Sequence, residues 1–139
     1  MAGNKTLTII KPNALKSGYL GQILAKIYDA GFRISAIKGL HLLTWEAEAF
    51  YDVHKDKQFY SDLVDYMTSG PVVVAILEKD NAVEDYRKLI GKNNPQEADD
   101  GTLRKLYGLS LRANAVHGSD CDENAERECD FFFSKIERF

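Results

Sequence analysis

The residue with the clearest chemical setting is His117, which lies in the stretch Asn-Ala-Val-His-Gly-Ser-Asp at residues 114–120. A short apolar run predicts a strand that delivers the imidazole, and Gly118 leaves room beside it. Ser119 or Asp120 would begin a helix, whose N-terminal backbone N–H groups favour an anion. A largely neutral imidazole can act as a nucleophile near pH 7. A structural histidine at a strand end is the alternative, and the local pattern alone leaves both open.

The other histidines and the glycines carry weaker signals. His41 lies in a strand pattern and His54 in a charged stretch, so both are most simply surface or edge residues. The sequence has no Gly-rich loop that ends in Gly-Lys-Ser/Thr, and no dinucleotide fingerprint. The pair Gly18 and Gly21 is most simply a turn and a close packing contact. Any phosphate site must therefore be built from cationic side chains that are scattered along the chain.

Hydrophobic periodicity predicts the elements that position these residues. Strands are expected at Thr6–Ile10, Phe32–Leu43, Pro71–Leu77 and Ala113–His117, and the third reads as a central strand buried on both faces. Helices are expected from Leu20 to Gly31, from Thr44, and at Phe59–Met67, Asn81–Ile90 and Asp120–Phe133. In the last helix, Asp120 is a candidate N-cap and Glu123 completes a capping box. Residues 91–102 form a long loop, which is usually functional or mobile.

This order of elements favours an α+β fold. We expect a ferredoxin-like sandwich, in which helices cover one face of a small antiparallel sheet. The length of 139 residues suits a single domain over residues 1–139. The net charge of −3 comes without the dense basic stripe of a nucleic-acid binder, so no specific nucleic acid is expected.

The cysteines and the apolar runs bear on location. If Cys121 and Cys129 share a helix, they are roughly 12 Å apart at the helical rise, too far for one disulfide. Two unpaired thiols suit a reducing compartment. The N-terminus lacks the apolar region of a signal peptide, and the longest apolar run, Val72–Leu77, is far short of a membrane span. These features predict a cytoplasmic protein that has no membrane partner.

The pattern Asn114-x-x-His117-Gly-Ser-Asp120 resembles the active-site signature of the nucleoside diphosphate kinases. The resemblance extends over residues 5–133. It includes further segments in the family's order and spacing, at Thr8–Pro12, Tyr51–Phe59, Tyr66–Pro71, Arg87–Gly91, Asn94-Pro95, Gly101–Arg104 and Ala125–Glu128. The family implies a ferredoxin-like domain and a ping-pong reaction. A nucleoside triphosphate phosphorylates the histidine and leaves as diphosphate, and a second diphosphate then accepts the group.

The resemblance also implies roles, position by position. His117 would be the nucleophile, and Lys11 would contact the terminal phosphate and the sugar. Arg87 and Arg104 would hold phosphates. The cofactor would be Mg²⁺, carried mainly by the nucleotide phosphates without a metal site of protein ligands. Phosphoryl transfer asks for positioning and for neutralisation of spreading charge, which these cations supply.

Further residues would surround the base and the ribose. Asn114 would reach the ribose 3′-hydroxyl, and Phe59 would stack on the base with Leu63 and Leu111 nearby. Because stacking does not depend on the base edge, purines and pyrimidines would both be accepted.

The remaining roles concern the imidazole itself. Tyr51 would line the pocket, and Glu128 would orient the imidazole, either directly or through the Ser119 hydroxyl. Taken singly, Glu128 is only one acid on an acidic helix, and Phe59 is a plausible core aromatic. The roles assigned to Glu128 and Phe59 rest on all the matched segments taken together.

Three departures from the family pattern lie in, or just after, the loop that follows the fourth predicted helix. Asn93 stands where a phosphate-binding threonine is usual. Asp100 precedes Gly101, where a proline is usual, and Lys105-Leu106 replaces the common Gly-Asp. These changes affect loop rigidity and one phosphate contact, but not the nucleophile.

The resemblance predicts a homo-oligomer, and leaves a tetramer and a hexamer both open. Two other functions compete with the kinase. A binding module of the same fold would place basic and aromatic residues along its strands, and the predicted strands show few of either. A phosphohistidine carrier or phosphatase would use His117 without a nucleotide, which leaves Phe59 and Asn114 unexplained.

Overall fold

The computed structural model describes residues 3–139, so Met1 and Ala2 at the start of the N-terminal segment lie outside the described residues. The elements follow one another as β1 (Lys5–Ile10), α1 (Pro12–Lys16), α2 (Leu20–Asp29), β2 (Arg33–Leu40), α3 (Thr44–Phe50), α4 (Tyr60–Met67), β3 (Val72–Glu78), α5 (Ala82–Ile90), α6 (Leu103–Tyr107), β4 (Val116–Gly118) and α7 (Asp122–Phe132). Single 3₁₀ turns lie at Asp52–His54 and Lys135–Glu137.

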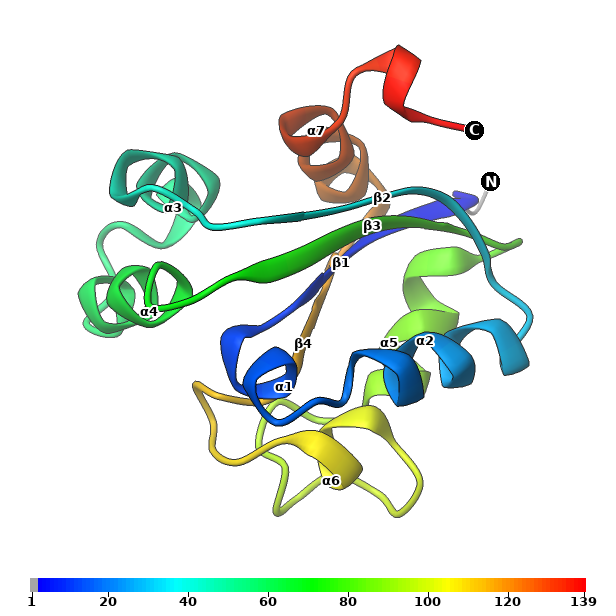
Figure 1. Cartoon of the computed structure of the whole chain (residues 1–139), viewed down its shortest axis with the longest axis horizontal. Coiled ribbons are helices and arrows are strands. Elements are labelled where there is room, and N and C mark those ends of the chain that lie inside the picture. Colours follow the sequence, from blue (N-terminus) through cyan, green and yellow to red (C-terminus); the bar gives the residue numbers. More distant parts are fainter. Residues whose placement is uncertain (1–2) are drawn as a thin grey trace.

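The strands form one antiparallel sheet in the order β2-β3-β1-β4 (Figure 1). This architecture confirms the predicted ferredoxin-like α+β fold. The central strand β3 is buried along almost its whole length, as expected. Its side chains alternate between two cores, because successive residues of a strand point to opposite faces. Val73 and Leu77 enter one core, and Val74 and Ile76 enter the other.

Helices cover both faces of the sheet, so the expectation of one covered face was wrong. The first core contains residues of α1, α2 and α5, and the second contains residues of α3, α4 and α7. Figure 1 shows the two groups on opposite sides of the strands. Strand β3 shows the reason. Its apolar side chains point to both faces of the sheet, so each face needs helices to bury them.

The predicted helices and strands are present, with shifts at their ends. Strand β2 stops at Leu40, and β4 runs from Val116 to Gly118. The last helix begins at Asp122, so Asp120 is not its N-cap; Cys121 takes that position without a side-chain cap. Asp120 instead accepts a hydrogen bond of 2.6 Å from the Asn124 amide. The single-turn helices α1 and α6 were not predicted, because five residues carry too little periodicity to detect.

None of the helices within residues 3–139 has both the length and the apolar character needed to cross a bilayer. Cys121 is exposed and Cys129 is buried, and both are free thiols, as the sequence predicted.

The long loop 91–102 begins at Gly91, whose backbone conformation is open only to glycine. Its φ of 87° and ψ of −176° fall in a region that side chains exclude. An added Cβ would also lie 2.7 Å from the Thr102 hydroxyl. Gly101, near the other end of the loop, has a similar φ of 85° but open space around it.

We therefore expect Gly91→Ala to lower the free energy of unfolding by about 1–3 kcal/mol or more, since strain and a steric clash add. Gly101→Ala is the matched control, with a loss of about 1–2 kcal/mol from left-handed strain alone. Urea unfolding of both variants measures the difference. Equal losses would contradict the proposed close contact between Gly91 and Thr102.

Candidate active site

His117 lies at the middle of β4, directly opposite Ile9 of β1. The pairing places its side chain on the same face as the core that contains Ile9 and Phe50. The Phe50 ring meets the imidazole edge-on, with 5.6 Å between the ring centroids. The sheet and this aromatic contact together fix the plane of the imidazole.

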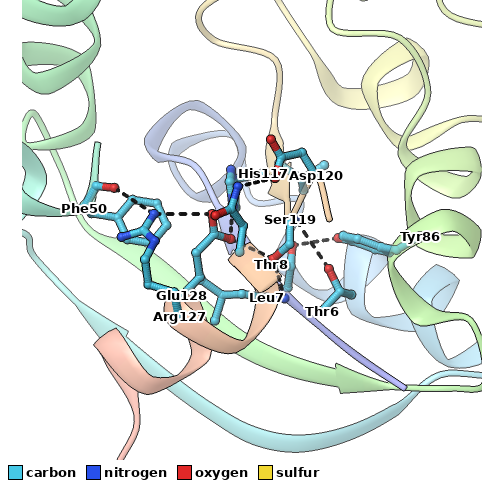
Figure 2. Close-up of polar contacts among 12 residues, drawn as sticks. Thr6, Leu7, Thr8, Phe50, Tyr86, His117, Ser119, Asp120, Arg127 and Glu128 are labelled. Carbon is cyan, nitrogen blue, oxygen red and sulfur yellow. Dashed lines mark hydrogen bonds and ion pairs between the residues drawn. The ribbon is translucent and has the colours of Figure 1, made fainter. Parts of the chain in front are cut away.

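The imidazole contacts a carboxylate directly. His117 Nε2 lies 2.8 Å from Glu128 Oε1, and the Ser119 hydroxyl donates to the same oxygen at 2.7 Å (Figure 2). Of the two expected routes, directly or through Ser119, the structure has the direct contact, with Ser119 bonded to the same oxygen. Ser119 Oγ in turn accepts the backbone N–H of Leu7 at 3.1 Å.

Glu128 is ionised despite its burial. Burial opposes the charged form, but the hydrogen bonds from His117 and Ser119 and the nearby Arg127 lower the pKa of Glu128 below its ordinary value. An ionised carboxylate can only accept, so Nε2 carries the imidazole proton in the neutral ring. Nδ1 then holds the free lone pair.

The chain reaches β4 through a tight turn at Ala115. Its φ is 78°, and the Val116 N–H donates to the Asn114 carbonyl at 3.0 Å. The Ala115 carbonyl accepts the backbone N–H of Lys11 at 2.8 Å, which anchors the turn to β1. A positive φ is costly for alanine, so the surrounding contacts must enforce it. The turn allows both Asn114 and His117 to line the same cleft.

Two buried cations in this cleft are each held by neutral acceptors of their own. Lys11 Nζ donates to Asn114 Oδ1 at 2.9 Å and to the Arg112 carbonyl at 3.4 Å. Arg104 donates to Asn93 Oδ1 at 2.9 Å, and to the Gly91 and Val116 carbonyls at 3.0 and 2.9 Å.

Both cations are destabilised in the charged form. Burial, followed by the charge of Arg104, lowers the pKa of Lys11 to about 7. Burial also lowers the pKa of Arg104 to about 10. An anion that enters beside them would restore both pKa values, so the pair favours an anionic ligand.

Asn93 links the two ends of this network. Its carbonyl accepts the Asn114 amide at 3.0 Å while its side-chain oxygen faces Arg104. The side-chain NH₂ of Asn93 is therefore the group left to donate to a ligand.

The cleft has a volume of about 1250 Å³. It brings together every site residue expected from the sequence except one: Lys11, Tyr51, Phe59, Leu63, Arg87, Asn93, Arg104, Leu111, Asn114, His117 and Glu128. Ser119 is the exception, because it is fully buried behind Glu128. Phe59 and Leu111 are 50% and 63% exposed, so each has a large apolar surface free for a flat ligand.

Sequence reasoning missed Arg127, which lies beside Glu128 in the same matched segment. Its guanidinium lies 3.9 Å from Glu128 Oε2, and donates to the Phe50 carbonyl at 3.4 Å. Neighbouring residues on a helix do not normally face each other, so the sequence favoured separate surroundings for the two. The sequence did contain one signal for this contact, because the cationic Arg127 directly precedes the acidic Glu128.

Within residues 3–139, His, Cys, Asp and Glu nowhere gather in a group of three that could hold an ion.

Comparison with known proteins decides the family. A family model described as nucleoside diphosphate kinase matches residues 4–138. A nucleoside diphosphate kinase of Campylobacter lari is 55% identical over 133 residues, which cover 96% of this chain and 97% of the relative. The chain belongs to the nucleoside diphosphate kinase family. A relative from Flavobacterium psychrophilum is 51% identical over the full length of both chains.

Solved nucleoside diphosphate kinases share the fold closely. The enzyme of Aquifex aeolicus matches with a TM-score of 0.97 and 38% identity, over 98% of this chain and 99% of that one. A halophilic nucleoside diphosphate kinase from Halobacterium salinarum, solved in complex with CDP, matches with a TM-score of 0.93 and 32% identity, over 99% and 92% of the two chains.

Family membership confirms the activity expected from the sequence. The chain is a phosphotransferase that passes the terminal phosphate of a nucleoside triphosphate to a nucleoside diphosphate. The comparisons thus favour the nucleoside diphosphate kinase over the binding module and over the carrier or phosphatase.

The lowered pKa of Lys11 gives a testable pH dependence. The unfolded chain keeps the lysine proton up to about pH 10.5, whereas the ligand-free folded chain loses it near pH 7. Between these values the unfolded state binds more protons, so the contribution of Lys11 to stability rises with pH, by up to about 1.4 kcal/mol per pH unit. Urea unfolding at pH 7 and pH 9 should show this rise in the wild type and lose it in Lys11→Met.

Lys16→Met serves as the control, because Lys16 is an exposed lysine one turn further along the chain. It should keep the wild-type pH dependence. An unchanged slope in Lys11→Met would mean that Lys11 stays protonated in the ligand-free protein.

Proposed function

We propose that this chain, acting as a single domain, transfers phosphate through a covalent intermediate on Nδ1 of His117. The contact between Nε2 and the ionised Glu128 carries the proposal, because it leaves Nδ1 as the basic nitrogen. The Nδ1 lone pair forms the N–P bond as the bond from the terminal phosphorus to its bridging oxygen breaks. The nucleoside diphosphate leaves with that oxygen, and the Nε2 proton stays on the ring. A second diphosphate reverses the step.

Glu128 assists by stabilising the positive charge that develops on the ring. The Nε2–H donates to a carboxylate throughout, and such charge-assisted hydrogen bonds are stronger than neutral ones. The Ser119 hydroxyl holds the same carboxylate oxygen in place. Mutual orientation of nucleophile and acceptor contributes much of the acceleration in phosphoryl transfer.

The phosphates bind among Lys11, Arg87, Arg104 and the NH₂ group of Asn93. Two unpartnered buried atoms support this assignment: the Tyr51 hydroxyl and Arg104 Nε have no hydrogen-bond partner within the described chain. Burial raises the pKa of Tyr51, so its phenol keeps its proton and can donate. An incoming phosphate would satisfy groups that are otherwise costly to bury.

The nucleoside lies along the rest of the cleft. Phe59 stacks on the base with Leu63 and Leu111 beside it, and Asn114 and Lys11 reach the ribose hydroxyls. Stacking without edge contacts supports a broad choice of bases.

Mg²⁺ is the proposed cofactor, bound mainly by phosphate oxygens of the nucleotide. Hard divalent cations prefer oxygen ligands. Asp120 would offer an additional contact, because it lies three residues after His117 and lines the same cleft. When bound, the ion neutralises charge on the phosphates.

We further propose a homo-oligomer, a tetramer or a hexamer, in the cytoplasm. The exposed Ile37 on the edge strand β2 supports self-association, and the two free thiols fit a reducing compartment. Light scattering of the purified protein distinguishes the two assemblies.

Incubation with γ-labelled ATP and Mg²⁺ should leave about one phosphate per chain on the protein, labile in acid and stable in alkali. Addition of an unlabelled diphosphate of another base should remove it. His117→Ala should abolish the label, since it removes the imidazole whose free nitrogen is set by the contact with Glu128. His41→Ala, an exposed histidine bonded to Thr68, should keep it. A label that persists in His117→Ala would overturn the mechanism.

Glu128→Gln keeps the size of the side chain but removes its charge. We expect turnover to fall by about 10- to 100-fold, as for other groups that orient a reactive histidine. Glu126→Gln, an exposed position two residues earlier on α7, should stay near the wild-type rate. In a His117→Ala background, Glu128→Gln should cause no further loss, because the two residues act as a unit. If Glu128→Gln keeps nearly wild-type turnover, Glu128 does not assist the reaction and its role is structural only.

A further inference from the structure

Strand β4 pairs with β1 over only three residues, and the last pair is Thr8 with Gly118. Beyond this point two side chains continue the connection. The Ser119 backbone N–H donates to Thr6 Oγ1 at 3.3 Å, and the Leu7 N–H donates to Ser119 Oγ at 3.1 Å. Thr6 and Ser119 are both fully buried. Figure 2 shows Thr6, Leu7 and Ser119 together at this junction.

These contacts fix the direction of the Ser119 hydroxyl. Its oxygen accepts from Leu7, so its single proton is left for Glu128 Oε1 at 2.7 Å. That proton shares the carboxylate oxygen with His117 Nε2. Any rotation of the Ser119 backbone would therefore change the position of the carboxylate that orients the nucleophile.

We propose that Thr6 is a positioning residue for the reaction. Its hydroxyl holds the Ser119 amide, and through Ser119 and Glu128 it sets the orientation of the His117 ring. Thr6 is itself rigid, because its backbone lies opposite Leu77 in the centre of the sheet. The inference rests on the proposed function, since it concerns the same nucleophile.

A purely structural role for Thr6 is the competing explanation: its hydroxyl would only satisfy a buried N–H group. Thr8 supplies the comparison within the molecule. It lies two residues along β1, on the same face, and is also fully buried. Its hydroxyl pairs with the Tyr86 hydroxyl at 2.7 Å, and not with Ser119.

The test compares Thr6→Val, Thr6→Ser and Thr8→Val in the full chain. Valine keeps the shape of threonine but cannot accept a hydrogen bond, whereas serine keeps the hydroxyl. Thr6→Val should lower kcat, expressed per chain that can be phosphorylated, by about tenfold and change KM little. A tenfold loss is typical when a contact that supports a reactive histidine is removed. Thr6→Ser should restore the wild-type kcat. Thr8→Val should lose stability but keep kcat.

Two measurements separate orientation from folding. The fraction of chains labelled by γ-labelled ATP counts the folded sites, so kcat is expressed per labelled site. The NMR signal of the His117 Nε2 proton reports its hydrogen bond to Glu128, and should shift or broaden in Thr6→Val but not in Thr8→Val. If Thr6→Val does not fold, Thr6→Ala takes its place with the same expectation.

The outcomes are distinct. Equal kcat per labelled site in Thr6→Val and Thr8→Val, with an unchanged imidazole signal, would overturn the positioning role and leave the proposed mechanism standing. Absence of label in the wild-type protein would overturn the proposed function itself.

Discussion

A single carboxylate oxygen, Oε1 of Glu128, holds the active site together. It accepts from the His117 imidazole and from the Ser119 hydroxyl in a buried environment. A buried carboxylate is tolerable only when it is fully paired, so the elements that bring its donors must keep their positions. Strand β4 supplies the imidazole, β1 anchors Ser119, and α7 carries the acid. The packing of α7 against the sheet therefore serves the chemistry as well as the core.

The end of the cleft that is proposed to bind phosphates follows a different principle. Its cations are held by carbonyl and amide oxygens, in a chain from Lys11 through Asn114 and Asn93 to Arg104. Neutral acceptors fix the geometry of a cation without neutralising it. Under the proposed function, an incoming phosphate would meet oriented donors without breaking an ion pair of Lys11 or Arg104, which would limit the reorganisation that transfer requires.

The sequence was sufficient for the family and the fold class, and all but one of its candidate site residues line one cleft, because motif spacing and apolar periodicity are local signals. Prediction from the sequence failed for features that depend on which residues become neighbours in space. Helices on both faces follow from how β3 alternates its side chains. The choice between a direct contact of Glu128 with the imidazole and one through Ser119 depends on the rotation of α7, and so does the approach of Arg127. This helix begins two residues later than expected. The role of Asn93 as a link between Asn114 and Arg104 requires a loop path that no local pattern encodes. Thr6 gave no signal, since a threonine in a strand is ordinary.

The hydrogen bond from Arg104 to the Val116 carbonyl has a consequence for solubility. Strand β4 lies at the edge of the sheet, and free carbonyl and N–H groups along an edge invite pairing with strands of other molecules. Arg104, in helix α6, occupies one of these carbonyls with its charged side chain, and its hydrogen bonds to Gly91 and Asn93 tie the 91–102 loop to the same edge. A substitution that loosens this loop would therefore expose a template for aggregation, so poor expression of a variant in this region can arise without any defect in its chemistry.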